Sequence, residues 1–556
     1  MKQTFFAVLV LLAGMPLFSA EKTDNFFKIT TTKDFSKGKL ENAVVVDTYG
    51  DGAIRLEKKG KKYASEGSFT SKPMTIQPGD WFTPSWNAQT PDGTWVEVKI
   101  SARIPHYETA DSGEYWTEFL SMGKWGQSIQ RGSTFEKTSA MLDSDGSQPR
   151  AAMDTDIFRE NGGAGRLFTQ IRLQAILHTD NPKVTPTLSL LTGSSKNSQA
   201  PNSERIVKPE MTKSTKGLDV EMKFPAYSLD IRDKTGLKMP DGTPIDKWSI
   251  SCCICSPTTV LGQLNYLGFR SKKPENWLPE EIALNCQDFT YGFGNWAYCT
   301  AAVGSFGYPA YARYGDLELL KSELAAGYPV GVGVHYSNSP NGQHPYVENA
   351  PIRNTDGHLL LVRGFKTIDG VDYIFVNDSA ASSDEKCILR YRCDQFLKAW
   401  EPNCMSYIIR EKERGTGQTP IVQRVPATLK ATKKSSDAYG REYTLMVKGK
   451  PLALDPNFAT WKAGAQNGGD TNKRSQVGKG GVIGYTVEAL GDKSRPKFEA
   501  TANQHFYYTI TSPDGNVYLS DARIQAALPK DYKGRVRVTV YVIRNNGNTY
   551  VAELKK

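Results

Sequence analysis

The apolar residues of the chain follow two different periodicities. Before about residue 191 and after about residue 438, apolar and polar residues alternate in short runs between Gly, Pro and Asp residues, as in Trp95–Ile100, Thr187–Leu191 and Val536–Val542. Alternation with period two, interrupted by turn residues, predicts antiparallel strands with one buried face. We therefore expect an N-terminal and a C-terminal β-sandwich domain.

In the middle of the chain the pattern changes to helices combined with strongly apolar strands. Val260, Leu264 and Leu267 repeat with helical spacing, and Gly268 is a typical helix end. A second amphipathic helix is expected over Asp316–Ala326. Strands are expected at Val330–Val334, His358–Val362, Tyr373–Asn377 and Cys387–Tyr391. Helices packed on an antiparallel sheet predict a central α+β domain.

The first twenty residues and two polar stretches complete the predicted organisation. Lys2, the apolar run Phe5–Ala13 and the small pair Ser19–Ala20 predict a secretory signal peptide, and hence an exported protein, periplasmic or secreted. No later segment approaches the roughly 20 apolar residues of a membrane span. The predicted parts are a signal peptide (1–20), an N-terminal β-sandwich domain (21–195), a linker (196–223), a central domain (224–412), a second linker (413–437) and a C-terminal β-sandwich domain (438–556).

Three residues at the ends of central elements could form a catalytic triad. Cys255 stands with Pro257 at a predicted helix start, where unpaired N–H groups and the helix dipole lower a thiol pKa. His358 begins one predicted strand, and Asp378 directly follows another. Cysteine catalysis needs a base near the sulfur and an acid that orients the base. We predict Cys255 as nucleophile, His358 as general base and Asp378 as orienting acid.

Two other histidines compete with His358 for the role of base. His335 follows a predicted strand, and His344 lies in a loop rich in Gly, Pro and Asn. Neither has an acid at a suitable offset in a strand. We therefore prefer His358.

The sequence around these residues resembles a known family. The segments Cys255–Thr258, Gly294–Trp296, Asp356–Phe365 and Val376–Asp378 are similar to secreted papain-like cysteine peptidases related to the bacteriocin-processing, double-glycine-leader peptidases. The resemblance covers roughly residues 224 to 410. It implies a papain-like fold, a peptide or protein substrate and the triad named above. It also places Asn295 and Trp296 near the rim of the substrate cleft.

One feature of that family is missing from the expected place. Its members usually carry a Gln before the nucleophile, whose side-chain amide helps to form the oxyanion hole. The corresponding segment here is Phe224–Leu229, with Leu229 at the expected Gln position. Loss of one oxyanion donor typically lowers the rate about 10²- to 10³-fold. Two alternatives therefore stay open: a catalytically silent binding protein, and a thiol amidase or transpeptidase acting on cell-wall peptides.

The eight cysteines all lie in the central region, between Cys252 and Cys404. Export favours disulfides. The cluster Cys252–Cys255 lacks the second ligand pair of a structural zinc site, so we expect no metal and no cofactor. The candidate local pairs are Cys286 with Cys299 and Cys387 with Cys393.

The net charge of +10 comes from lysines spread along the chain, without a basic stripe interleaved with aromatics. We therefore expect no nucleic-acid partner. The expected partner is a peptide or protein substrate. Trp81, Trp86, Trp95, Trp116 and Trp125 leave open a contact of the β-sandwich domains with glycans or envelope polymers, against the alternative that they are core residues.

Overall fold

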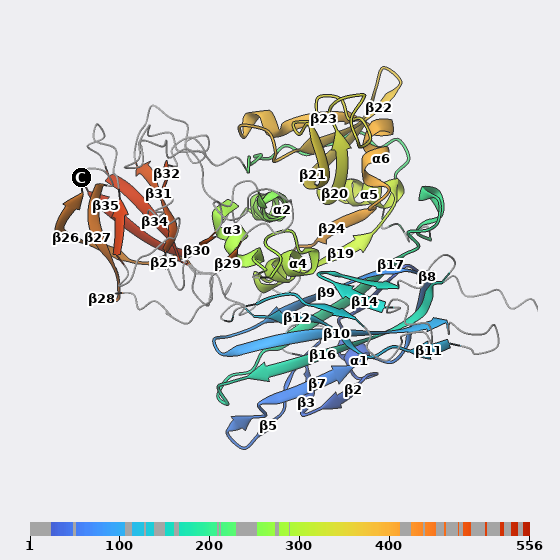
Figure 1. Ribbon diagram of the computed structural model, residues 1–556, viewed down its shortest axis with the longest axis horizontal. Helices are drawn as coiled ribbons and strands as arrows, with labels where there is room; N and C mark the ends of the chain where they lie inside the picture. Colours follow the sequence, from blue (N-terminus) through green and yellow to red (C-terminus); the bar gives the residue numbers. More distant parts are fainter. Residues whose placement is uncertain are drawn as a thin grey trace, which may run out of the picture.

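The computed structural model describes most of the chain up to residue 411 and parts of the remainder. The described ranges are 24–47, 52–105, 114–126, 131–137, 151–160, 166–207, 213–229, 253–272, 279–288, 290–411 and segments between 424 and 555, with a few single positions besides. The predicted signal peptide lies outside them. The chain is a multidomain, sheet-rich protein, and helices α2 and α4 lie between its N-terminal and central sheets (Figure 1).

The N-terminal region contains two large antiparallel sheets. The first has the order β13 (Phe135–Lys137), β14 (Ala151–Asp154), β15 (Ile157–Glu160), β9 (Trp81–Gln89), β17 (Thr187–Lys196), β4 (Ala53–Leu56), β3 (Ala43–Val46), with β1 (Phe26–Ile29) beside β17. The second has the order β11 (Glu114–Trp116), β10 (Thr94–Pro105), β16 (Phe168–Thr179), β7 (Glu66–Thr70), β2 (Lys39–Glu41), with β12 (Leu120–Trp125) beside β10 and β8 (Met74–Gly79) beside β16. Smaller elements are α1 (Thr32–Phe35), the hairpin of β5 (Lys58–Lys59) and β6 (Lys62–Tyr63), and η1 (Asn202–Glu204).

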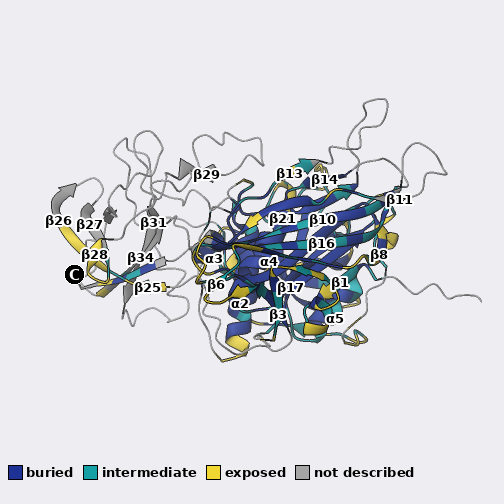
Figure 2. Cartoon of the chain, turned by 90° about the horizontal axis from the view of Figure 1, so that it is seen from below, coloured by how far each residue is buried: buried dark blue, intermediate teal, exposed yellow. Residues whose placement is uncertain are grey.

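The apolar interior of this region follows from the alternation in its strands. Val96, Val98 and Ile100 of β10 are buried, as the pattern predicts, and so are Leu173 and Leu177 of the neighbouring β16. Residues from both sheets belong to one core cluster. Figure 2 shows the buried residues along these strands and the exposed ones at loops and edges.

The central module is a seven-stranded antiparallel sheet combined with helices. The sheet has the order β19 (Ala310–Tyr314), β24 (Met405–Ile409), β20 (Val330–Ser337), β21 (Asn354–Ile368), β22 (Val371–Asn377), β23 (Ile388–Arg392), with β18 (Val220–Glu221) beside β21. The helices are α2 (Cys255–Arg270), α3 (Pro279–Cys286), α4 (Trp296–Ser305), α5 (Leu317–Ala325), α6 (Cys393–Trp400) and the short η3 (Glu385–Cys387).

The helices and strands predicted for the central module are present, but several of them begin or end at other residues than predicted. α2 continues past Gly268 to Arg270, and the chain leaves the helix where Lys272 takes a left-handed conformation, with φ 58°. α5 begins after Asp316, whose side chain caps it. β21 begins before the expected strand, so His358 lies inside it and not at its start.

Buried polar side chains join the first N-terminal sheet to the central module. Asn87 of β9 donates from Nδ2 to the carbonyl of Ala310 at 2.8 Å and accepts the N–H of the same residue at 3.0 Å. Ser85 Oγ accepts the N–H of Ala312 at 2.9 Å. Strand β19 of the central sheet is therefore bonded to the N-terminal sheet through side chains.

Aromatic residues complete this interface. Trp86 and Trp125 are fully buried, and both meet the ring of Tyr298 in α4 edge-on, with centroid distances of 5.9 and 5.3 Å. Trp81 is flanked by Arg159 and Lys196, whose cationic groups lie 4.4 and 4.1 Å from its ring centroid. Trp86 and Trp125 are thus core residues, which argues against a sugar contact for these two.

Residues 196–223, predicted to be a linker, are packed against the central module at both ends. Lys196 Nζ donates to the carbonyls of Pro402 and Asn403 at 2.9 and 3.1 Å, and Arg205 donates to Pro402 at 2.7 Å. At the other end, β18 adds a short strand to the edge of β21.

The described strands beyond residue 424 form further sheets. One has the order β25 (Arg424–Pro426), β35 (Thr549–Lys555), β34 (Arg535–Val542), β31 (Val482–Leu490), β32 (Phe506–Tyr508), and another contains β26 (Thr428–Ser436), β27 (Gly440–Val447), β28 (Lys450–Pro451) and β33 (Arg523–Ala526). β29 (Trp461–Lys462) pairs with β30 (Gln476–Val477). Arg424 binds Glu281 of α3 through two hydrogen bonds of 2.8 and 2.7 Å, which ties this region to the central module.

Candidate active site

Cys255 is the first residue of α2, with Ile254 as N-cap. Its side chain is half-buried. Val260, Leu264 and Leu267 are buried, as their spacing predicts, and α2 contacts β20 and β21, so the start of the helix is held against the sheet. The unpaired N–H groups of the first turn and the helix dipole favour a negative charge on this sulfur.

His358 lies on β21, opposite Val334 of β20, and connects Cys255 to Asp378. Its Nε2 donates to Asp378 Oδ1 at 2.7 Å, and both side chains are almost fully buried. The Cys255 thiol is hydrogen-bonded to His358. Because Nε2 is occupied by Asp378, Nδ1 is the nitrogen available to the sulfur. The three predicted triad residues therefore come together in the predicted order.

Asp378 accepts several hydrogen bonds besides that of His358. The hydroxyls of Tyr336 and Tyr391 donate to Oδ2 at 3.2 and 2.8 Å, and the N–H of Ala380 donates to Oδ1 at 3.0 Å. Each donor stabilises the ionised carboxylate in its buried site. The two tyrosines could not be singled out from the sequence, because in strands β20 and β23 they have the spacing of ordinary core residues.

The pKa values of the three groups shift toward an ion pair. Burial raises the pKa of Cys255, but the hydrogen bond and charge of His358 and nearby backbone N–H groups outweigh it, and the pKa is lowered. Burial alone lowers the pKa of His358, yet Asp378 and Cys255 together raise it to about 10. Burial likewise raises the pKa of Asp378, and His358 with the other donors lowers it overall. These shifts favour a thiolate beside an imidazolium over the neutral pair.

The two competing histidines form a cluster of their own. His344 Nε2 lies 2.7 Å from Oδ1 of the exposed Asp356, an acid partner that the sequence did not suggest. The ring of His335 packs edge-on against that of His344, with centroids 5.5 Å apart. Of these three histidines, His358 is the one whose side chain is hydrogen-bonded to the Cys255 thiol.

Asn295 and Trp296, expected near the cleft rim, stand at the start of α4. Asn295 is fully buried, donates to Asp288 Oδ2 at 2.9 Å and accepts the N–H of Tyr298 as helix cap. The N–H of Trp296 donates to Asp156 Oδ2 at 2.6 Å, across the domain interface. The amide nitrogen and the amide oxygen of Asn295 thus both form hydrogen bonds within the protein, which indicates a structural role for this residue.

Leu229 lies beside the loop that follows Asp378. Its N–H donates to the carbonyl of Ser379 at 2.8 Å, and its side chain is half-buried. Residues 230–252, which lead to the nucleophile, lie outside the described residues. An oxyanion donor from the segment directly before Cys255 would come from these residues.

The four cysteines of the two predicted pairs form no disulfide in the structure, and the two pairs differ in geometry. Cys286 and Cys299 are hydrogen-bonded to each other through their side chains, so they stay a candidate pair. Cys387 and Cys393 lie at opposite ends of the extended strand β23. At about 3.3 Å per residue they are roughly 20 Å apart. This exceeds the span of a disulfide, so the second predicted pair is wrong.

The described residues offer neither a metal site nor a membrane-spanning helix. They contain no group of three or more His, Cys, Asp or Glu residues that could hold a metal ion. No helix in this part of the chain is long and apolar enough to cross a membrane. Cys252 of the predicted cysteine cluster falls outside the described ranges.

Two family models match the chain. The model for the Peptidase C39 N-terminal domain matches residues 25–195, and the model for the Peptidase C39-like family matches residues 242–405. The second range contains Cys255, His358 and Asp378, and it begins after Leu229. No curated protein matches the chain.

Solved structures give weaker similarities. Digestive procathepsin L 3 from the larval midgut of Tenebrio molitor is 15% identical over 37% of this chain and 73% of its own, with a TM-score of 0.25. A family 11 carbohydrate-binding module from Clostridium thermocellum is 10% identical over 34% of this chain and 94% of its own, with a TM-score of 0.14. At these TM-scores neither structure bears on the assignment of the fold or the site.

Proposed function

We propose that this chain, which belongs to the Peptidase C39-like family, is an exported cysteine peptidase that hydrolyses peptide bonds through Cys255, His358 and Asp378. The observation that carries the proposal is the continuous hydrogen-bonded path from the Cys255 thiol through His358 to the buried Asp378. The domain plan that we propose with it is a papain-like α+β module between two β-sandwich domains.

The proposed reaction has two stages, and each uses the same three residues. The Cys255 thiolate attacks the carbonyl carbon of the scissile bond, and N–H groups of the first turn of α2 stabilise the oxyanion. The His358 imidazolium then gives its proton to the leaving nitrogen as the C–N bond breaks, which leaves a thioester. His358 next removes a proton from water, the resulting hydroxide attacks the thioester carbonyl, and the C–S bond breaks. Asp378 keeps Nε2 of His358 protonated throughout.

Cleavage of a peptide library tests this proposal. Purified mature protein is incubated with the library, and new peptide termini are identified by mass spectrometry. We expect cleavage by the wild type, none above background by Cys255→Ala, and unchanged cleavage by Cys404→Ser, which alters a buried cysteine away from the triad. Absence of any Cys255-dependent product would overturn the proposal in favour of a silent binding protein.

The same experiment separates hydrolysis from the related thiol chemistry on cell-wall peptides. A transpeptidase passes the acyl group from the thioester to an amine, so added amine acceptor would appear in the products. An amidase would instead release products only from cell-wall peptides. Hydrolytic products from ordinary peptides, insensitive to added amine, are expected here.

A further inference from the structure

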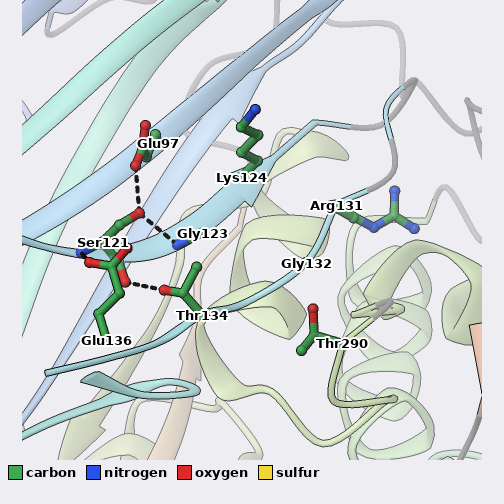
Figure 3. Close-up of a pocket in the computed structure, with 9 residues that line it drawn as sticks. All are labelled: Glu97, Ser121, Gly123, Lys124, Arg131, Gly132, Thr134, Glu136 and Thr290. Atoms are coloured by element: carbon green, nitrogen blue, oxygen red, sulfur yellow. Dashed lines mark hydrogen bonds between the residues drawn. The ribbon is translucent and has the colours of Figure 1, made fainter. Parts of the chain in front are cut away.

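A cavity of about 390 Å³, lined by polar and charged residues and glycines, opens between the N-terminal sheets and the turn before α4. Figure 3 shows Glu97 of β10, Ser121 and Lys124 of β12 and Glu136 of β13 around it. The central module contributes Thr290 to the lining. The cavity therefore lies at the interface of the two regions, with most of its wall in the N-terminal region.

Helix α4 connects this cavity to the nucleophile. The Tyr298 hydroxyl donates to the backbone carbonyl of Lys124 at 3.0 Å. The next residue, Cys299, has its Sγ 3.0 Å from Oγ of Ser256, the residue that follows Cys255. One turn of α4 thus touches both the wall of the cavity and the first turn of the nucleophile helix.

The turn that carries Thr290 also holds Tyr291, whose phenol senses the charge of Cys255. Asp288 Oδ1 accepts the N–H groups of Thr290 and Tyr291 at 2.9 and 3.2 Å, which fixes the turn. Burial, neighbouring carboxylates and Cys255 all raise the pKa of Tyr291, so its phenol lies within electrostatic range of the sulfur. The residue that follows Thr290 is therefore electrostatically coupled to the nucleophile.

The charged side chains of the cavity differ in whether they already have a hydrogen-bond or ion-pair partner. Glu97 accepts from Ser121 Oγ at 2.6 Å and is paired with Lys99 at 3.4 Å. Glu136 accepts the N–H of Ser121 at 2.7 Å. Lys124 is exposed, its ammonium lies 5.7 Å from the ring centroid of Trp95, and it has no carboxylate partner in the described part of the chain. The exposed cation of the cavity is thus available to a ligand.

We propose that this interdomain cavity is a specificity pocket for an acidic side chain of the peptide substrate, with Lys124 as the cation that binds its carboxylate. The inference rests on the proposed peptidase function and adds a substrate class to it. Charge-assisted hydrogen bonds are the stronger class, so an acidic residue in this pocket should be preferred over an uncharged isostere by about 10-fold or more.

Matched quenched peptides that carry Glu, Gln or Lys at each position around a cleaved bond test the pocket. We expect the wild type to prefer Glu at one position in kcat/KM, Lys124→Gln to lose that preference, and Lys124→Glu to favour Lys at the same position. Lys183→Glu changes an exposed lysine elsewhere in the N-terminal region and should leave the profile unchanged. An acidic preference at no position, or one that survives Lys124→Glu, would overturn the inference.

A binding measurement keeps this test separate from that of catalysis. Cys255→Ala protein and its Lys124→Glu double variant are applied to an array of the same peptides. Preferential capture of acidic peptides by the single variant, lost in the double variant, supports the pocket even if no peptide is cleaved. Capture that is independent of peptide charge would overturn the proposed pocket, even if the protein is an active peptidase.

Discussion

Asp378 accepts hydrogen bonds from His358, Tyr336, Tyr391 and a backbone N–H, although it is fully buried. A buried carboxylate without such donors would tend to be neutral. Because these donors keep it ionised, its charge raises the pKa of His358, and the proton of the Cys255–His358 pair stays on the imidazole. The reactivity of one thiol thus depends on residues that do not touch it.

The pH dependence of kcat/KM should report this ion pair. The active form needs Cys255 ionised and His358 protonated, so activity should rise with pH through the lowered pKa of Cys255 and fall as pH passes about 10, the raised pKa of His358. Asp378→Asn removes the negative charge that raises the pKa of His358, so the alkaline limb of the pH profile should move to lower pH. A pH series on a cleaved peptide measures both; an alkaline limb unmoved by the substitution would contradict this assignment.

Removal of one tyrosine hydroxyl should cost stability. Tyr391→Phe deletes a 2.8 Å hydrogen bond to a buried charge. The free energy of unfolding should fall by about 1.5–3 kcal/mol, the range for bonds to charged groups. Urea unfolding measures the change. Tyr373→Phe, on the neighbouring strand β22, has no described hydroxyl bond and should change stability little; equal losses in the two variants would argue against the role of Tyr391.

At the scale of elements, the sequence pattern located α2 and α5 by their helical spacing of apolar residues and four strands of the central sheet by their apolar runs. It missed α4, since every residue from Ala297 to Ser305 is buried and the helix has no polar face to reveal its period. It also missed β19, which packs on β9 and β17 of the N-terminal region, and the inner strand β24. Cys255 and Asp378 could be predicted because they stand at element ends, and His358 because it begins the buried run of β21. Tyr336 and Tyr391 could not, because strand pairing alone brings them to Asp378.

The close contact of α4 with β9 gives a prediction at this scale. A Cβ added at Gly304 would lie 2.4 Å from Nδ2 of Asn87, which bonds both backbone groups of Ala310. Gly304→Ala should therefore destabilise the protein by about 1–3 kcal/mol despite the better helix propensity of alanine. Chemical denaturation measures this. Gly357→Ala, where the added Cβ meets no atom within 4 Å, is the control; a Gly304→Ala protein as stable as the wild type would refute the close fit.

At the scale of the whole molecule, the N-terminal sheets and the central module share one core. Tyr298 packs between Trp86 and Trp125, and the cluster that contains them includes residues of α2. The sequence predicted separate domains joined by a linker, because composition shows where polar stretches lie but not what packs across them. The N-terminal region is consequently part of the site's support and not an independent appendage.

A truncated chain tests this shared core. Without residues 1–207 the buried faces of α4 and β19 would be exposed to water. We expect the chain 208–556 to aggregate or to unfold without a cooperative transition, whereas the chain 24–411 should unfold in a single calorimetric transition. Cooperative folding of the chain 208–556 on its own would show that the interface with the N-terminal region is dispensable.

The most direct measurement is the site-resolved alkylation of Cys255 at neutral pH. Folded mature protein and His358→Ala are treated with a low dose of iodoacetamide, and labelling of each cysteine is followed by peptide mass spectrometry. Fast labelling of Cys255 in the wild type that collapses in His358→Ala, with the buried Cys299 and Cys404 unreactive in both, is the expected result. Slow labelling of Cys255, or labelling that is equally fast in the two proteins, would contradict a thiolate activated by His358.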